Sequence, residues 1–142
     1  MIVADTSAIV ALIDHSDGAH RAILALYTRD PDAWTLPWPI LPEVAYLVGR
    51  YGGPAVEQTF LEDVAARHYG VEWGQPVDLS RAAEINRQYA GLHLGLVDTV
   101  VMAIAERLGA RAIATLDRRH FGAVTLRGAP TLVPAATRRR PR

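Results

Sequence analysis

The fold is decided at the start of the chain, where residues 2–13 read IVADTSAIVALI. Three apolar residues precede Asp5, and mostly apolar residues follow it at helical spacing. This order predicts a short buried strand over 2–4, followed by a helix that Thr6 or Ser7 caps. A strand that leads directly into a helix is the building unit of α/β folds.

Short apolar segments alternate with helical segments along the rest of the chain. Further strands are expected at 34–36, 71–73, 111–115 and 131–133, and helices at 19–28, 43–51, 54–67, 79–89 and 97–108. Prolines at 37, 39 and 42 predict an extended approach to the helix at 43, with Pro42 beside its first turn. Residues 116–121 are expected to form a loop or a single helical turn. The alternation predicts an α/β fold, with a mostly parallel central sheet flanked by helices on both faces.

Composition excludes several kinds of chemistry. The 142 residues carry a net charge of zero and are 50% hydrophobic, which suits one folded domain. The absence of cysteine excludes thiol nucleophiles and zinc–thiolate sites. The absence of lysine excludes Walker-type nucleotide binding and Schiff-base catalysis. We expect a cytoplasmic protein. Stretches free of Asp, Glu, Lys and Arg reach only ten residues, too few for a membrane span, and Asp5 follows only three apolar positions, which does not fit a signal peptide.

Three aspartates lie at the ends of the expected elements. Asp5 ends the first strand, Asp117 follows the strand at 111–115, and Asp98 lies in the first turn of the helix at 97–108. Ligands of open parallel sheets bind beyond the carboxyl ends of the strands, so Asp5 and Asp117 are expected to share one crevice if their strands are neighbours. Glu43, at the start of its own helix, could join them.

A cluster of three or four carboxylates needs a counter-charge. Two unit charges 4 Å apart repel by about 4 kcal/mol at an effective dielectric constant near 20. Because the chain has no lysine, a divalent ion is the expected partner, and oxygen ligands favour Mg²⁺ or Mn²⁺. Such a site suits the cleavage of phosphodiesters, in which the ion activates water and stabilises charge on the phosphate.

Each acidic residue also has an ordinary structural interpretation. Asp98 could interact with the dipole of its own helix, and Asp5 could be no more than a helix cap. Glu43 could be a solvated helix residue, and Asp117 could belong to a surface turn.

Four segments carry a resemblance to a known family. They are Val3-Ala4-Asp5-Thr6-Ser7-Ala8, Pro42-Glu43-Val44, Leu96-Val97-Asp98-Thr99 and Thr115-Leu116-Asp117-Arg118-Arg119-His120-Phe121. In this order and spacing the chain resembles a PIN domain, specifically the VapC-type ribonuclease toxins of bacterial toxin–antitoxin pairs. The resemblance places one PIN domain over residues 1–133 and leaves 134–142 as a basic tail that is expected to be disordered. Thr99 departs from the alanine that many relatives carry there.

The resemblance implies a metal-dependent endoribonuclease and its site. The catalytic acids would be Asp5, Glu43, Asp98 and Asp117; Asp5 and Asp98 would contact Mg²⁺ or Mn²⁺ directly, supported by hydroxyls of Thr6, Ser7 and Thr115. It further implies a homodimer that a VapB-like antitoxin inhibits. The sequence does not name the RNA that is cut, the antitoxin, or the number of ions. A DNA or flap nuclease, and a nuclease-inactive protein-binding module, remain alternatives.

The remaining polar and aromatic residues are given simpler roles. Arg118 and Arg119 could contact RNA phosphates or simply be solvated, as could the arginines at 138–142. The five histidines, including His93 and His120, show no metal-ligand spacing, so structural or surface roles are expected. The tryptophans are expected to pack in the core or at a dimer interface rather than to stack on bases. The stripe of Val44, Leu47 and Val48 suits a dimer face or the core.

Overall fold

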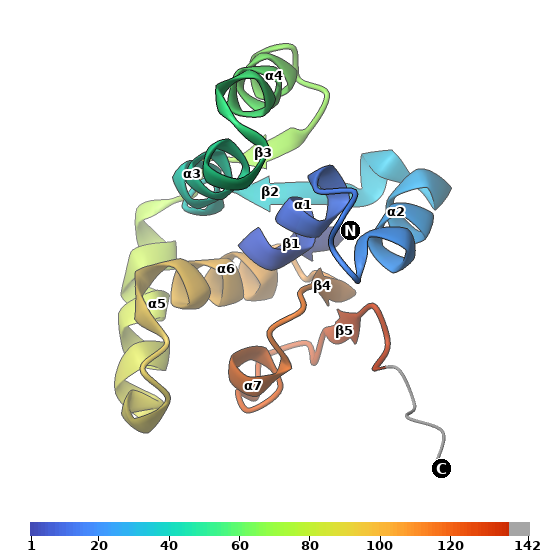
Figure 1. Ribbon diagram of the computed structural model, residues 1–142. Helices are drawn as coiled ribbons and strands as arrows, with labels where there is room; N and C mark the ends of the chain where they lie inside the picture. Colours follow the sequence, from blue (N-terminus) through green and yellow to red (C-terminus); the bar gives the residue numbers. More distant parts are fainter. Residues whose placement is uncertain (137–142) are drawn as a thin grey trace.

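A computed structural model describes residues 1–136, and Figure 1 shows the path of the chain. The five strands are β1 (Ile2–Ala4), β2 (Trp34–Pro37), β3 (Gly70–Glu72), β4 (Ala112–Ala114) and β5 (Thr131–Val133). The α-helices are α1 (Thr6–Ile13), α2 (His20–Arg29), α3 (Ile40–Gly52), α4 (Pro54–Ala65), α5 (Pro76–Gln88), α6 (Gly95–Arg107) and α7 (Arg118–Phe121). Two 3₁₀ turns, η1 (Pro31–Ala33) and η2 (Ala90–Leu92), complete the described elements.

The strands form one sheet in the order β3-β2-β1-β4-β5, and every pair is parallel. The predicted α/β class is therefore confirmed. Val3, Ala4, Ile113 and Ala114 in the two central strands are fully buried. Strands that are covered on both faces have no solvated side, which explains why these segments are short apolar runs without alternation.

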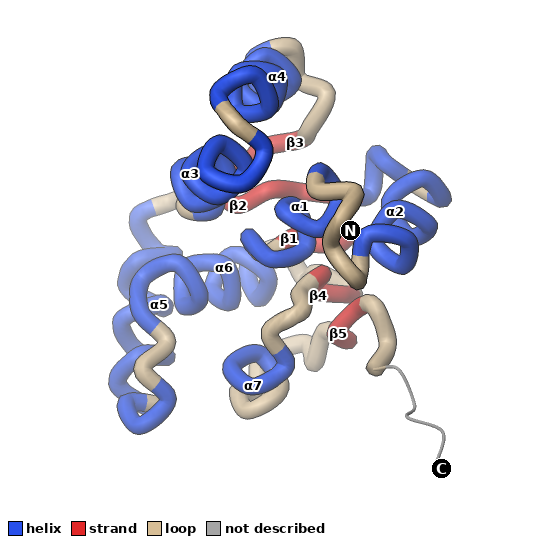
Figure 2. The backbone as a smooth tube through the Cα atoms, viewed as in Figure 1, coloured by secondary structure: helices blue, strands red, loops and turns tan. Residues whose placement is uncertain are grey.

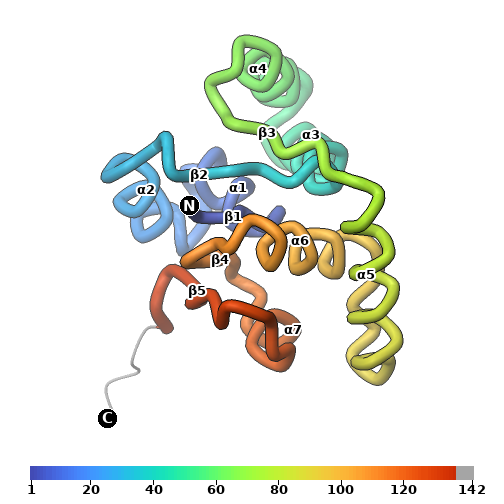
Figure 3. The backbone as a smooth tube through the Cα atoms, turned by 180° about the vertical axis from the view of Figure 1, so that it is seen from behind, coloured from blue at the N-terminus to red at the C-terminus, as the bar shows by residue number. Residues whose placement is uncertain are grey.

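The connections cover the sheet on two sides (Figures 2 and 3). Helices α1 to α4 lie in the connections from β1 to β2 and from β2 to β3, which run toward one edge of the sheet. Helices α5 and α6 then lead the chain from that edge back to β4, on the other side of β1. Right-handed crossovers therefore put α5 and α6 on the face opposite α1. The strand order reverses between β1 and β4, and in such sheets this switch point forms a ligand crevice at the carboxyl ends of the strands.

Two local predictions about the chain are corrected. Helix α3 begins at Ile40 rather than near 43, because Pro39 adopts helical backbone angles at the N-cap and Pro42 is accommodated in the first turn. Helix α1 has Asp5 as its N-cap, without a side-chain capping bond, so the predicted caps Thr6 and Ser7 lie inside the helix. Their hydroxyls are thereby free to contact the acidic residues.

The apolar and aromatic predictions have mixed outcomes. Val44 and Val48 are buried, so the α3 stripe belongs mainly to the core. Trp34 is buried in the core as expected, whereas Trp73 is 71% exposed, because it lies just past the edge strand β3. No helix within residues 1–136 combines the length and apolar character needed to cross a membrane. The predicted tail is described only to residue 136, and the arginines at 138–142 lie outside the described residues.

Candidate active site

Asp5 is fixed at the switch point by its own backbone. Its N–H donates to the carbonyl of Ala114 over 2.8 Å, which continues the β1–β4 ladder by one bond. The side chain is 5% exposed, and its Oδ2 accepts hydrogen bonds from Thr115 Oγ1 (2.9 Å) and Ser7 Oγ (3.1 Å). Burial raises the pKa of Asp5 against the lowering effect of these donors. Two of the three predicted supporting hydroxyls, those of Ser7 and Thr115, therefore hold this carboxylate.

The same hydroxyls shape the turn that carries Asp117. The Asp117 N–H donates to Thr115 Oγ1 over 3.0 Å, and the Leu116 N–H donates to Ser7 Oγ over 2.9 Å. Thr115 is 1% exposed, and its hydroxyl both donates to Asp5 and accepts from the turn. Two short polar side chains thus connect the end of β1 to the segment after β4.

Glu43 approaches the cluster from the first turn of α3. Its Oε1 accepts a hydrogen bond from Thr6 Oγ1 over 2.7 Å, while the rest of the residue is exposed. The buried Thr6 therefore orients the carboxylate that lies at the solvent side of the group. The hydroxyl of Thr6, the third predicted supporting group, therefore contacts Glu43 rather than Asp5.

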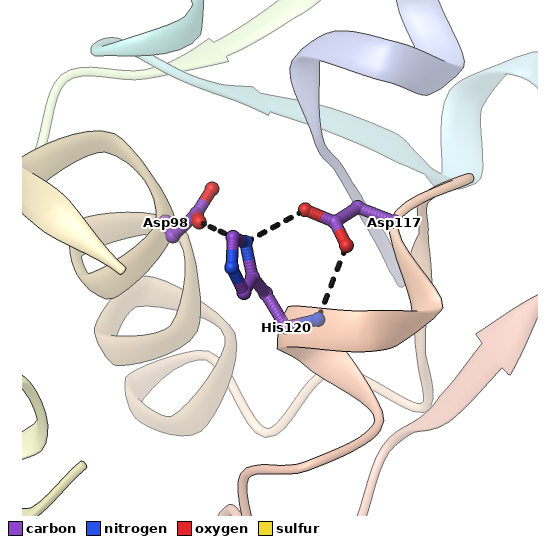
Figure 4. A group of neighbouring side chains, drawn as sticks. All are labelled: Asp98, Asp117 and His120. Carbon is purple, nitrogen blue, oxygen red and sulfur yellow. Dashed lines mark hydrogen bonds and ion pairs between the residues drawn. The ribbon is translucent and has the colours of Figure 1, made fainter. Parts of the chain in front are cut away.

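Asp98 and Asp117 face each other across the ring of His120 (Figure 4). The His120 Nδ1 lies 3.3 Å from Asp98 Oδ2 and 2.9 Å from Asp117 Oδ2. Asp117 is also the N-cap of α7, where its Oδ1 accepts from the His120 N–H over 3.1 Å. Asp98 lies in the first turn of α6, but its side chain is directed toward this group and is 19% exposed.

The four acids influence one another electrostatically. Burial raises the pKa of Asp98 to about 6, and the negative charges of Asp5, Asp117 and Glu43 add to the increase, while His120 opposes it. Among residues 1–136, the arginines that form ion pairs with acids are Arg81 and Arg107, and both pair with acids outside this cluster. Within residues 1–136 the acidic cluster therefore has no arginine partner, and the basic group beside it is His120.

This donor set fits a divalent cation. Asp98, Asp117 and His120 each offer one ligand atom, and these atoms lie within 4.8 Å of one another. Three features favour a bound positive ion: Asp5 is buried, burial and neighbouring charges raise the pKa of Asp98, and the chain has no lysine.

Sequence reasoning missed His120. It expected a structural or surface role, whereas the ring lies between two of the predicted catalytic acids. Spacing could not find it, because its partner Asp98 is on a different helix and one histidine makes no motif. The signal that was present is the i,i+3 relation of His120 to Asp117, which a helical turn after Asp117 brings to the same side.

The remaining candidates lie at the margin. Arg118 and Arg119 are exposed on α7, and Arg118 Nη2 donates to the carbonyl of Pro134 after β5. His93 is exposed, in agreement with a surface role. Thr99 is buried, and its hydroxyl donates to the carbonyls of Gly95 and Leu96 in its own helix. The departure at this position therefore leaves the acidic cluster intact.

The sequence pattern of the PIN domain matches residues 2–125. The chain belongs to the PIN domain family. This PIN domain is 29% identical, over 123 residues, to ribonuclease VapC26 of Mycobacterium tuberculosis, an alignment that covers 87% of this chain and 91% of that protein. The predicted resemblance is therefore confirmed.

Two solved structures share the fold of this PIN domain. The first is VapC20 of Mycobacterium tuberculosis, a sarcin-ricin loop cleaving toxin; it has a TM-score of 0.78 and 19% identity, and the match covers 89% of this chain and 97% of that one. The second is VapBC2 of Rickettsia felis bound to a DNA fragment from their promoter; it has a TM-score of 0.68 and 18% identity, and covers 93% and 97% of the two chains. At these identities the likeness concerns the fold.

Proposed function

We propose that this PIN domain is a metal-dependent endoribonuclease and acts as the toxin of a toxin–antitoxin pair. The observation that carries the proposal is the convergence of Asp5, Asp98, Asp117 and Glu43. Burial, with the negative charges of the other three acids added, raises the pKa of Asp98 to about 6. The likeness to ribonuclease VapC26 supports RNA as the substrate class. We assign the direct metal contacts to Asp5 and Asp98, with Mg²⁺ or Mn²⁺ as the ion.

The chain's own groups prepare the site. Thr115 and Ser7 fix the Oδ2 atom of Asp5, and Thr6 turns Glu43 toward the cluster. Carboxylates held in this way are preorganised, so that little reorganisation is needed when charge develops on a phosphate. When bound, a divalent ion would supply the Lewis acidity and the activated water for cleavage of the phosphodiester.

Different observations support the proposed RNA substrate and the proposed protein partners. The exposed arginines Arg118 and Arg119 lie on the same short helix as His120, where we propose that they contact RNA phosphates. The overall charge of zero makes general attraction to nucleic acid weak, so that local arginines have to provide it. We also propose that an antitoxin inhibits the chain, which the likeness of its fold to a VapBC complex supports. The proposed homodimer is supported only by the resemblance to VapC-type toxins.

The decisive experiment measures cleavage of a defined RNA by the purified chain with Mg²⁺, with Mn²⁺ and with EDTA. We expect cleavage with either ion, none with EDTA, and a loss of roughly 100-fold or more in Asp5→Asn and Asp98→Asn. Asp32→Asn, which alters an exposed carboxyl on η1, is the matched control and should cleave like the wild type.

Two outcomes would replace the proposal. Faster cleavage of a DNA duplex or flap than of RNA would favour the DNA nuclease alternative. Absence of any cleavage, together with a Mg²⁺ titration that produces no heat, would favour a protein-binding module.

A further inference from the structure

The imidazole of His120 is directed into the acidic cluster rather than into solvent. The ring lies between Asp98 and Asp117 in Figure 4, and its Nδ1 is the atom that approaches both carboxylates, over 3.3 and 2.9 Å. The side chain is 26% exposed, so that solvent and ions can reach it.

The spacing of the three atoms matches the edges of a coordination octahedron. Bonds of about 2.1 Å to a small divalent ion place neighbouring ligand atoms about 3 Å apart. Nδ1 lies at nearly this distance from Asp98 Oδ2 and Asp117 Oδ2, and the ligand atoms of the three residues all lie within 4.8 Å of one another. An ion can therefore contact all three with small rotations of the side chains.

The local backbone favours this orientation of the ring. The His120 N–H donates to Asp117 Oδ1, so that one carboxylate oxygen is engaged by the main chain of α7. The other oxygen, Oδ2, is the one that faces Nδ1. Ring and carboxylate are thus held on the same side of a single helical turn, as two ligands of one ion have to be.

We propose that His120 Nδ1 and Asp117 are further direct ligands of the divalent ion that Asp5 and Asp98 hold, and that this nitrogen makes the site prefer Mn²⁺ to Mg²⁺. The proposal rests on the proposed function, because it concerns the same site. In the neutral tautomer with its hydrogen on Nε2, the Nδ1 lone pair is available to the ion. Imidazole binds transition-metal ions better than Mg²⁺, which prefers oxygen ligands and retains water.

Pulsed electron paramagnetic resonance of bound Mn²⁺ tests the contact directly. The full chain, prepared without a histidine tag and stripped of metal, receives less than one equivalent of Mn²⁺. We expect ¹⁴N coupling to Mn²⁺ in the wild type and its loss in His120→Ala and in His120→Gln, which keeps a side chain of similar length. His68→Ala is the matched control, since His68 also pairs through Nδ1 with a carboxylate, that of Asp63, and it should keep the coupling.

Calorimetry of the same proteins tests the selectivity. His120→Ala should weaken Mn²⁺ binding about tenfold and Mg²⁺ binding less than about threefold. Absence of ¹⁴N coupling in the wild type, or unchanged or tighter Mn²⁺ binding in His120→Ala, would show that the ring leaves when the ion enters, and would overturn the inference alone. If Asp98→Asn binds Mn²⁺ as the wild type does, the ion is elsewhere and the proposed function fails as well.

Discussion

The hydroxyl of Thr115 lies 2.9 Å from Oδ2 of Asp5 and donates to it, although the two residues are 110 positions apart in the sequence. The same oxygen accepts the N–H of Asp117. One buried side chain therefore sets the positions of two acidic residues, at the ends of two neighbouring strands. This relationship makes Thr115 a positioning residue for the proposed reaction.

Thr115→Val tests that role with little change in shape. The variant leaves Asp5 with one donor fewer, and loss of such a supporting contact typically costs roughly 10–100-fold in metal affinity or activity. We expect both the Mn²⁺ affinity and kcat to fall, which calorimetry and single-turnover cleavage will measure. Thr59→Val is the control, because its hydroxyl contacts only the carbonyl of Ala55 in its own exposed helix. Equal affinity and kcat in Thr115→Val and the wild type would remove Thr115 from the site.

Asp98→Asn is expected to raise the melting temperature of the metal-free protein. The folded state raises the pKa of Asp98 from 3.8 to about 6, so it holds this proton more tightly than the unfolded chain does. The stabilising effect of that proton is complete below pH 4 and is lost as the pH rises to 6 and beyond. The variant has no such loss, and should therefore melt roughly 3 °C above the wild type at pH 7.5 and equally at pH 3.8.

Thermal melts in EDTA at several pH values will measure this difference. Asp32→Asn, on the exposed η1 turn, serves as control and should follow the wild type at every pH. A constant difference between Asp98→Asn and the wild type from pH 4 to 7.5 would contradict the electrostatic origin. Addition of Mn²⁺ should reverse the order, because the ion stabilises only the folded state that binds it.

Arg107→Met is expected to destabilise the fold without touching the acidic cluster. Arg107 ends α6 and contacts both oxygens of Asp78, which is 2% exposed, at 2.7 and 3.0 Å, and Glu72 at 2.9 Å. Its removal leaves a buried carboxylate without its partner, which costs about 3–5 kcal/mol. Urea denaturation will measure the loss of unfolding free energy. Arg50→Met is the control, because exposed Arg50 contacts the Tyr46 hydroxyl, and its effect should stay within about 0.5 kcal/mol.

Deletion of residues 138–142 should leave RNA cleavage within a few-fold of the wild type. Inhibition is expected from a separate antitoxin, and we predict that such a protein places an arginine or lysine among Asp5, Glu43, Asp98 and Asp117. Growth of cells that express the full or shortened chain, with and without a candidate antitoxin, will measure the effect. A large gain of activity on truncation would identify the tail as the inhibitor instead.

The two central strands could be predicted because short segments of the sequence are sufficient to indicate them. Residues 2–4 and 112–114 are apolar runs, too short for helices and followed by Asp5 or by Thr115 and Asp117, and this pattern predicts buried parallel strands. The start of α3 could not be predicted so well. The three prolines favour an extended chain before residue 43. Ile40, however, is fully buried in the core, and its packing there favours a helix that already begins at Ile40.

The candidate site was predictable in its acids and less so in its other members. Asp5, Asp98 and Asp117 stand at element ends, where a parallel sheet directs them to one crevice. The ring of His120 on α7 reaches Asp98 on α6, and the sequence alone does not give the relative placement of these two helices. Thr6 and Ser7 were expected to act either as helix caps or as supporting hydroxyls. Because α1 begins at Thr6, with Asp5 at the N-cap, neither residue is the cap, and both hydroxyls can support the acids.

The strand order of the sheet also bears on biosynthesis. β1 pairs with β4, and the contacts of Asp5 and Thr6 reach residues 110 and 37 positions away. A growing chain therefore cannot complete the acidic cluster until the segment through Asp117 and His120 has left the ribosome and β4 has joined the sheet. A partly synthesised chain therefore lacks the complete acidic cluster, and cleavage by the proposed mechanism is expected only after β4 has paired with β1.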